Sequence, residues 1–235
     1  MNIIVERFNK IQSNISKLNN SKSPKIVAVS KTFSLDHIMP LIEYGHNHFG
    51  ENKVQEAEAK WLQIKKKKKN LQLHMIGKLQ SNKAKQAVKI FDYIHSLDSE
   101  KLAKKISEEQ EKQNKTPKIF IQINLGKEVQ KSGIVKENLL DFYKFTKDLN
   151  LNVIGLMCIP PFEEDSSKYF SQMSELNEMI SLNELSMGMS ADYLKAIKFS
   201  SSFVRIGIWF KQTFPFLINP IIGNRFRKQL DKRDS

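Results

Sequence analysis

The feature that most constrains the fold of this chain is a regular alternation of short apolar segments with segments of helical periodicity. Eight segments have the length and apolar content of buried strands, at residues 26–30, 47–51, 71–76, 93–97, 119–125, 153–159, 184–189 and 203–207. The segments between them carry apolar residues at helical spacing, at residues 35–44, 54–64, 83–89, 99–113, 136–149, 166–181 and 191–199. Such alternation requires parallel strands with right-handed crossovers. Eight strands in 235 residues therefore predict an α/β fold, a closed (β/α)8 TIM-like barrel rather than an open sheet.

An extra amphipathic helix is predicted before the first strand, because residues 1–20 place Ile4, Phe8, Ile11 and Ile15 on one helix face. Further along, either Asp98 or Ser99 is expected to cap the start of a helix. The hydrophobic content of 40% suffices for a large core, and no change of composition marks a linker. We therefore expect one barrel domain.

The cysteine content bears on the compartment. Cys158 is the single cysteine, so no intramolecular disulfide is possible and a reducing cytoplasm is the expected setting. It lies in an apolar run and is expected to be a small core residue. A charge at Glu6 interrupts any signal-peptide core, and no apolar stretch is long enough to cross a bilayer. We therefore expect a cytoplasmic protein with no membrane partner.

The formal net charge of +13 raises nucleic acid or an anionic surface as a partner. However, the lysines are scattered, and the one run, at residues 65–69, is predicted to lie in a loop. Neither a zinc-ligand spacing nor an aromatic RNA-binding motif accompanies them. The pattern favours a solvated basic surface over specific nucleic-acid binding.

The first predicted strand ends at a lysine, Lys31. One interpretation is a side chain that extends to solvent from the strand end. The other is chemical, because a partly desolvated lysine has a lowered pKa and can form a Schiff base with an aldehyde. In a barrel of this type the working site lies at the carboxyl ends of the strands, where Lys31 is expected.

The last two predicted strands end in residues suited to phosphate. Ser190 is expected at the start of a helix and Gly207 allows close approach of backbone, although an ordinary N-cap and a tight turn explain them equally well. A phosphate site there, next to Lys31 on the first strand, suits pyridoxal 5′-phosphate (PLP). Arg205 would then face the ring and keep the pyridine nitrogen unprotonated, which weakens the cofactor as an electron sink.

Several ordered motifs resemble the PLP homeostasis proteins. They are AVSKT at 28–32, HFGEN at 48–52 with VQE at 54–56, HMIGKLQSNK at 74–83, KSGI at 131–134, GLM at 155–157, LSMGMSAD at 185–192 and VRIG at 204–207. The resemblance spans roughly residues 1–210. The family is similar to the barrel domain of bacterial alanine racemases, of PLP fold type III, and lacks their second, β-rich domain.

The resemblance implies a function and a set of cofactor-binding residues. It implies a non-catalytic carrier that buffers or delivers PLP in vitamin B6 homeostasis, with apo PLP-dependent enzymes as partners. We expect the protein to be a monomer. The implied cofactor-binding residues are Lys31, which carries the Schiff base, and Asn52, His74, Met187, Ser190, Arg205 and Gly207. No catalytic residue and no metal ligand is implied.

The chain departs from the family pattern after Gly207. Relatives usually have Thr or Ser at the next position, where this chain has Ile208, and residues 211–235 form a divergent tail. The loss of a side-chain donor to phosphate is expected to weaken binding by one to two decades, since a hydrogen bond to a charged group is worth about 1.5–3 kcal/mol. On the same basis Ile208→Thr is expected to tighten it.

Two other functions remain open from the sequence. The first is a PLP-dependent amino-acid racemase-like or decarboxylase-like enzyme; racemisation needs two acid/base groups, and no tyrosine of this chain has an obvious claim to the second place. The other is a basic nucleic-acid or membrane-surface protein that has lost cofactor binding.

Overall fold

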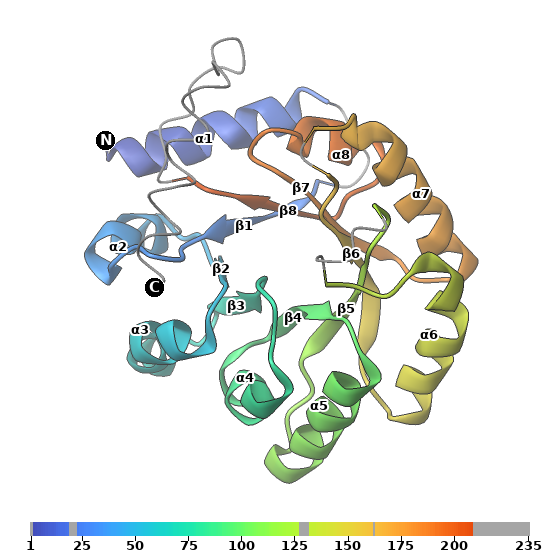
Figure 1. Cartoon of the computed structure of the whole chain (residues 1–235). Helices are drawn as coiled ribbons and strands as arrows, with labels where there is room; N and C mark the ends of the chain where they lie inside the picture. The colour runs from blue at the N-terminus through green and yellow to red at the C-terminus, as the bar shows by residue number, and fades with distance from the viewer. Residues whose placement is uncertain (1, 19–22, 127–131, 162, 209–235) are drawn as a thin grey trace.

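The computed structural model describes residues 2–18, 23–126, 132–161 and 163–208, so the predicted tail at residues 211–235 lies outside the described residues. Eight parallel strands form a closed barrel in sequence order (Figure 1). The strands are β1 (Lys25–Val29), β2 (His48–Glu51), β3 (Gln72–Met75), β4 (Tyr93–Leu97), β5 (Lys118–Ile123), β6 (Val153–Cys158), β7 (Glu184–Met189) and β8 (Phe203–Ile206). β1 pairs with β8 as well as with β2, which closes the ring. The predicted barrel is confirmed.

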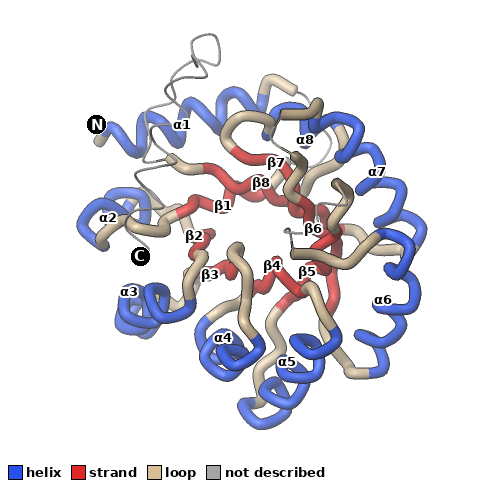
Figure 2. The backbone as a smooth tube through the Cα atoms, viewed as in Figure 1, coloured by secondary structure: helices blue, strands red, loops and turns tan. Residues whose placement is uncertain are grey.

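The helices surround the ring of strands (Figure 2). Seven of the described helices follow strands: α2 (Leu35–Glu43), α3 (Val54–Lys67), α4 (Ala84–Ile90), α5 (Glu100–Gln113), α6 (Leu139–Asp148), α7 (Ser166–Met179) and α8 (Tyr193–Lys198). The predicted N-terminal helix is α1 (Ile3–Ser16), which buries Phe8 and Ile11. It contacts the end of α2 through a Tyr44–Asn9 hydrogen bond of 2.8 Å and the start of α8 through an Asn14–Tyr193 hydrogen bond of 3.3 Å. Of the two predicted caps, Ser99 caps α5 and accepts from the Leu102 N–H.

One predicted loop is wrong. α3 continues to Lys67, so the first three residues of the lysine run are helical. Cations are favoured in the last turn of a helix, where carbonyl groups point outward. Lys65 also donates to the Asp92 carboxylate at 2.5 Å and to the Ile90 carbonyl at 3.0 Å, which anchors the end of α3 beside β4.

Side chains alternate between the inside of the barrel and the helix layer, as the pleat of a strand requires. The inner cluster contains Val27, Tyr93, Phe120, Met157 and Phe203. A larger cluster between strands and helices includes Cys158, which is 1% exposed, so its prediction as a core residue is confirmed. Burial raises the pKa of the Cys158 thiol to about 12. Within the described ranges, no helix is long and apolar enough to cross a membrane.

Gly155 has no room for a side chain beside β7, and we expect Gly155→Ala to destabilise the barrel by about 1–3 kcal/mol. A Cβ atom at this position would lie 1.8 Å from the Glu184 carbonyl oxygen of β7, which is backbone and cannot move aside. Gly50→Ala is the matched control, because a Cβ there would meet the Ile76 and Val27 side-chain ends at 2.9 Å. Urea unfolding of both variants measures the difference; equal losses would contradict the argument.

Candidate functional site

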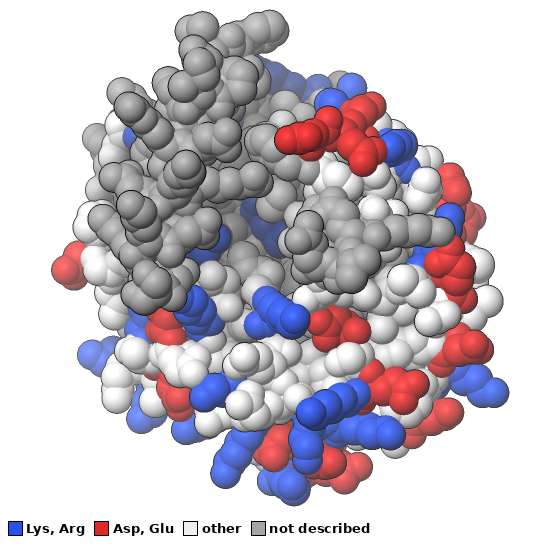
Figure 3. Space-filling model, viewed as in Figure 1, with Lys and Arg blue, Asp and Glu red and all other residues white. Residues whose placement is uncertain are grey.

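The carboxyl ends of the strands bring most of the predicted site residues to one end of the barrel. Lys31 follows β1, Asn52 follows β2, Ser190 follows β7 and Gly207 follows β8. Figure 3 shows Lys and Arg side chains inside and around a hollow in the centre of the molecule. A parallel barrel collects these ends by its topology, which is why residues far apart in sequence meet there.

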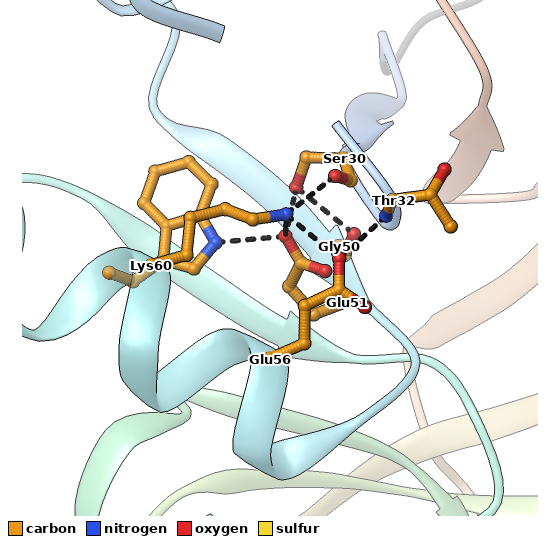
Figure 4. Close-up of polar contacts among 7 residues, drawn as sticks. Ser30, Thr32, Gly50, Glu51, Glu56 and Lys60 are labelled. Carbon is orange, nitrogen blue, oxygen red and sulfur yellow. Dashed lines mark hydrogen bonds and ion pairs between the residues drawn. The ribbon is translucent and has the colours of Figure 1, made fainter. Parts of the chain in front are cut away.

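Lys31 is exposed and lies in a turn whose next residue, Thr32, has a φ of 67°. This left-handed conformation is strained for a β-branched residue. The turn is held by a hydrogen bond of 2.6 Å from the Thr32 N–H to Oε1 of Glu56 on α3 (Figure 4). Strain of this kind persists only where surrounding contacts over-determine the backbone, which is typical of functional turns.

A buried ionic network supports the same turn (Figure 4). The Lys60 ammonium on α3 donates to the Ser30 carbonyl at 2.9 Å and to Oε1 of both Glu51 and Glu56 at 3.0 Å. Glu51, which is fully buried, also accepts from the Ser30 hydroxyl at 2.7 Å and from the Trp61 indole at 2.9 Å. The network therefore fixes the residues on both sides of Lys31. Sequence reasoning missed it, although Glu56 and Lys60 are four residues apart on one helix, a spacing that favours an ion pair.

Ser190 and Gly207 are in contact. The Gly207 N–H donates to the Ser190 hydroxyl at 3.2 Å, which joins the ends of β7 and β8. Ser190 is not the N-cap predicted as one option, because α8 begins only at Tyr193, after Asp192. The reason is that the Asp192 carboxylate accepts from the Met189 N–H at 2.6 Å and closes an intervening turn.

Arg205 points into the barrel from β8 and is 4% exposed. Its Nη1 donates to the Ser186 carbonyl at 2.7 Å and to the Ser186 hydroxyl at 2.6 Å, and its Nη2 donates to the Cys158 carbonyl at 2.9 Å. Burial lowers the pKa of Arg205, yet guanidinium stays charged at neutral pH.

The remaining predicted residues lie in three different environments. Asn52 packs against Gly77, and its Oδ1 is buried without a partner among the described residues. Met187 is fully buried in the cluster between strands and helices, so its side chain faces α8 and its neighbours rather than the hollow. His74 is fully buried inside the barrel and bonds to His48 and His95. The cofactor contacts implied for these three residues stay predictions.

Ile208 is 1% exposed and belongs to the cluster between strands and helices. Ile208 lies two residues beyond the end of β8 and faces the same side as Ile206, outward, whereas Arg205 faces inward. A threonine hydroxyl at 208 would lie among apolar side chains, so its placement gives no reason to expect that Ile208→Thr tightens phosphate binding.

Because four histidines are buried or half-buried, we expect the free energy of unfolding to fall in mild acid. Burial lowers the pKa of His46 and of His48 to about 4, and holds the pKa of His74 and of His95 well below 6.5. The unfolded chain takes up protons near pH 6.5 while the folded chain does not. We therefore expect a loss of up to about 1.4 kcal/mol per histidine per pH unit below about pH 6.5. Urea midpoints at about pH 7 and about pH 5 measure this; equal midpoints would contradict it.

A cavity of about 530 Å³ adjoins the same end of the barrel, between the loops after β3, β4 and β5. It is lined by polar residues that include Lys78, Gln80, Asn82, Asp98 and Ser99, and none of the predicted cofactor-binding residues lines it. The cofactor prediction thus rests on the β1, β7 and β8 ends. Those ends bring together the Lys31 amine, the Ser190 hydroxyl with the backbone N–H of Gly207, and the Arg205 guanidinium.

Comparisons with known proteins identify the family of the chain. Residues 7–210 match the family described as alanine racemase, N-terminal domain. The PLP homeostasis protein of Aquifex aeolicus is 35% identical over 217 residues, covering 86% of this chain and 94% of that protein. The homologous protein of Haemophilus influenzae is 38% identical over 200 residues, covering 80% and 84%.

Solved structures share the fold of this chain. PipY of Synechococcus elongatus, determined with PLP bound, is 32% identical, has a TM-score of 0.77, and covers 87% of this chain and 97% of its own. An alanine racemase of Clostridium difficile has a TM-score of 0.69 at 14% identity and covers 92% of this chain but 59% of the racemase. The racemase shares the barrel fold.

Proposed function

The chain belongs to the family of PLP homeostasis proteins, and from this premise we propose that it binds PLP at the carboxyl ends of β1, β7 and β8 and buffers or delivers it. The observation that carries the proposal is the hydrogen bond between the Gly207 N–H and the Ser190 hydroxyl. Gly207 directly follows β8, the strand that carries Arg205 and pairs with β1. In our proposal the Ser190 hydroxyl and the Gly207 backbone hold the phosphate, Arg205 faces the ring, and the Lys31 amine attaches the cofactor covalently.

The chain's own residues perform binding and orientation in this proposal. When bound, PLP supplies an aldehyde that an amine can attack and a ring that withdraws electrons. Arg205 is held by three hydrogen bonds to β6 and β7, so its charge has a fixed place inside the barrel. A permanently charged guanidinium beside the pyridine nitrogen disfavours its protonation, which supports binding and storage over carbanion chemistry.

We propose that the protein is a carrier and not an enzyme. Racemisation needs a second acid/base group opposite the lysine, usually a tyrosine. Three tyrosines in the described part of the chain bond elsewhere: Tyr44 to Asn9, Tyr169 to Glu164, and Tyr193 to Asn14. Tyr93 lies in the inner cluster of the barrel, stacked on His74, and Tyr143 lies on α6, packed against the cluster between strands and helices. The α-hydrogen of alanine or serine in heavy water is the test: exchange that requires Lys31 would establish the enzyme.

Residence in the cytoplasm, a monomeric state and transfer to apo PLP-dependent enzymes complete the proposal. Cys158 supports the compartment, because a lone buried thiol offers no disulfide. Size-exclusion chromatography with light scattering tests the monomer, and activation of an apo-aminotransferase by the loaded protein tests transfer. A dimer, or no activation beyond that given by free PLP, would contradict these parts.

The first experiment is the visible absorption spectrum of the purified protein before and after addition of PLP, followed by borohydride reduction and mass spectrometry. A yellow chromophore that saturates with PLP, and a pyridoxyl adduct on Lys31, are the expected results. Absence of both at saturating PLP would overturn the proposed function.

A further inference from the structure

A chain of polar side chains crosses the interior of the barrel from β2 to β8. The His48 Nδ1 lies 2.9 Å from the His74 Nε2, and the His74 Nδ1 lies 2.9 Å from the His95 Nε2. The His95 Nδ1 lies 2.7 Å from the Ser186 hydroxyl, which accepts from Arg205 at 2.6 Å. Five side chains from five strands are thus joined by consecutive hydrogen bonds, and aromatic rings of the inner cluster surround them.

The three imidazoles of the chain are neutral. His74, His95 and Ser186 are fully buried, and His48 is half-buried. Burial lowers the pKa of each histidine, and the charge of Arg205 lowers that of His95 further. Lys25 and Lys118 act in the same direction on His48. A neutral imidazole has one N–H and one acceptor nitrogen, so each ring donates on one side and accepts on the other.

The hydrogen bonds along this series of side chains could all donate toward Ser186 or all donate away from it, and Arg205 decides between the two directions. A guanidinium can only donate, so the Ser186 oxygen accepts from Nη1. If the His95 Nδ1 also donated to Ser186, the Ser186 O–H would lose its sole acceptor in a site without water access. If Ser186 donates to the His95 Nδ1 instead, every polar atom between Arg205 and His48 is satisfied. Unsatisfied buried hydroxyl groups are costly, so the second arrangement prevails.

We propose that Arg205 fixes the tautomers of all three histidines, and that His95, His74 and His48 are positioning residues that hold Arg205 through Ser186. Ser186 donates to His95, the His95 Nε2–H donates to His74, and the His74 Nε2–H donates to His48. The last donor, Nε2–H of His48, remains at the other end of the barrel. His48 there lines a cavity of about 360 Å³ beside Phe8 and Gln12 of α1. The effect of these histidines on PLP binding rests on the proposed function, whereas the assignment of their tautomers is independent of it.

Nitrogen-15 NMR of the imidazoles in the protein without cofactor tests the direction. The expected result is Nε2–H with unprotonated Nδ1 for His48, His74 and His95. Arg205→Lys, which keeps a donor-only cation, is expected to preserve this pattern, whereas Arg205→Met is expected to give mixed tautomers at His95. A protonated Nδ1 at His95 in the wild-type protein, or mixed tautomers throughout, would overturn the proposal.

Ser186 variants test the link if the Arg205 variants do not fold. Ser186→Ala is expected to mix the His95 tautomers, and Ser186→Thr, which retains a hydroxyl, is expected to restore the wild-type spectrum. An unchanged His95 spectrum in Ser186→Ala would show that Arg205 does not act through this residue.

The positioning role is tested by PLP binding to His95→Phe, which keeps an aromatic ring but removes both nitrogens. We expect roughly five- to tenfold weaker binding, the effect of losing one neutral hydrogen bond in the chain, together with a shifted absorption maximum as Arg205 moves. His37→Phe, at an exposed site bonded to Ser34, is the matched control. An unshifted maximum with wild-type affinity would overturn the role. Failure of the wild-type protein to bind PLP would instead overturn the proposed function and leave the NMR result intact.

Discussion

Replacing Lys31 with alanine is expected to abolish covalent attachment of PLP and to leave the barrel folded. The side chain is exposed and makes no hydrogen bond or ion pair with the described residues, so its removal should change the free energy of unfolding by less than about 0.5 kcal/mol. The turn around it is held by neighbours, through Glu56 and Lys60, and does not depend on the Lys31 amine.

The measurement is mass spectrometry after incubation with PLP and borohydride reduction, with the yellow chromophore as a second signal. The matched control is Lys78→Ala, because Lys78 lies at the same end of the barrel and lines the polar cavity. We expect one pyridoxyl group on the wild type and on Lys78→Ala, and none on Lys31→Ala. A stable adduct that persists at wild-type yield in Lys31→Ala would show that another lysine holds the cofactor.

The fold could be predicted from the sequence because barrel formation depends on a local signal that is repeated eight times. Strand and helix periods are set by backbone geometry, and each apolar face must be buried whatever the partner. The segments at 93–97 and 184–189 coincide with β4 and β7 for that reason. The errors lie at element ends: the lysine run, which extends α3, and Ser190, which lies within the turn that Asp192 closes.

The candidate site could be predicted only in part. Lys31, Ser190 and Gly207 could be predicted to lie at one end of the molecule, because strand ends gather there in a parallel barrel, and their roles toward PLP stay predictions. The hydrogen-bonded series from His48 to Arg205 could not be predicted, because its hydrogen bonds join residues 19 to 91 positions apart across the barrel interior. His74 and His95 also fit their strands' alternation as ordinary inward-facing residues. What decides their partners is barrel closure and register, which no local pattern encodes.

The ionic network around Lys60 is a second feature that was not predicted from the sequence. Replacing Lys60 with methionine is expected to destabilise the protein by about 3–5 kcal/mol. The ammonium and the Glu51 carboxylate are 9% and 0% exposed, so the variant leaves a buried carboxylate without its cation. The Ser30 carbonyl and the Glu56 carboxylate lose a donor at the same time, which frees the turn that carries Lys31. Urea unfolding measures the stability loss, and we expect weaker PLP binding in parallel.

Two further variants separate the buried charge from side-chain packing. Lys105→Met, which removes the exposed pair with Glu108, is expected to change the stability far less than Lys60→Met, because surface ion pairs contribute little. Adding Glu51→Gln to Lys60→Met removes the unpaired charge while the amide still accepts from Trp61, so part of the lost stability should return. If Lys60→Met were as mild as Lys105→Met, or if Glu51→Gln made it worse, the network would not support the Lys31 turn in the way proposed. Recovered stability without recovered PLP binding would locate the role of Lys60 in its bonds to the Ser30 carbonyl and to Glu56, the two contacts that Glu51→Gln cannot replace.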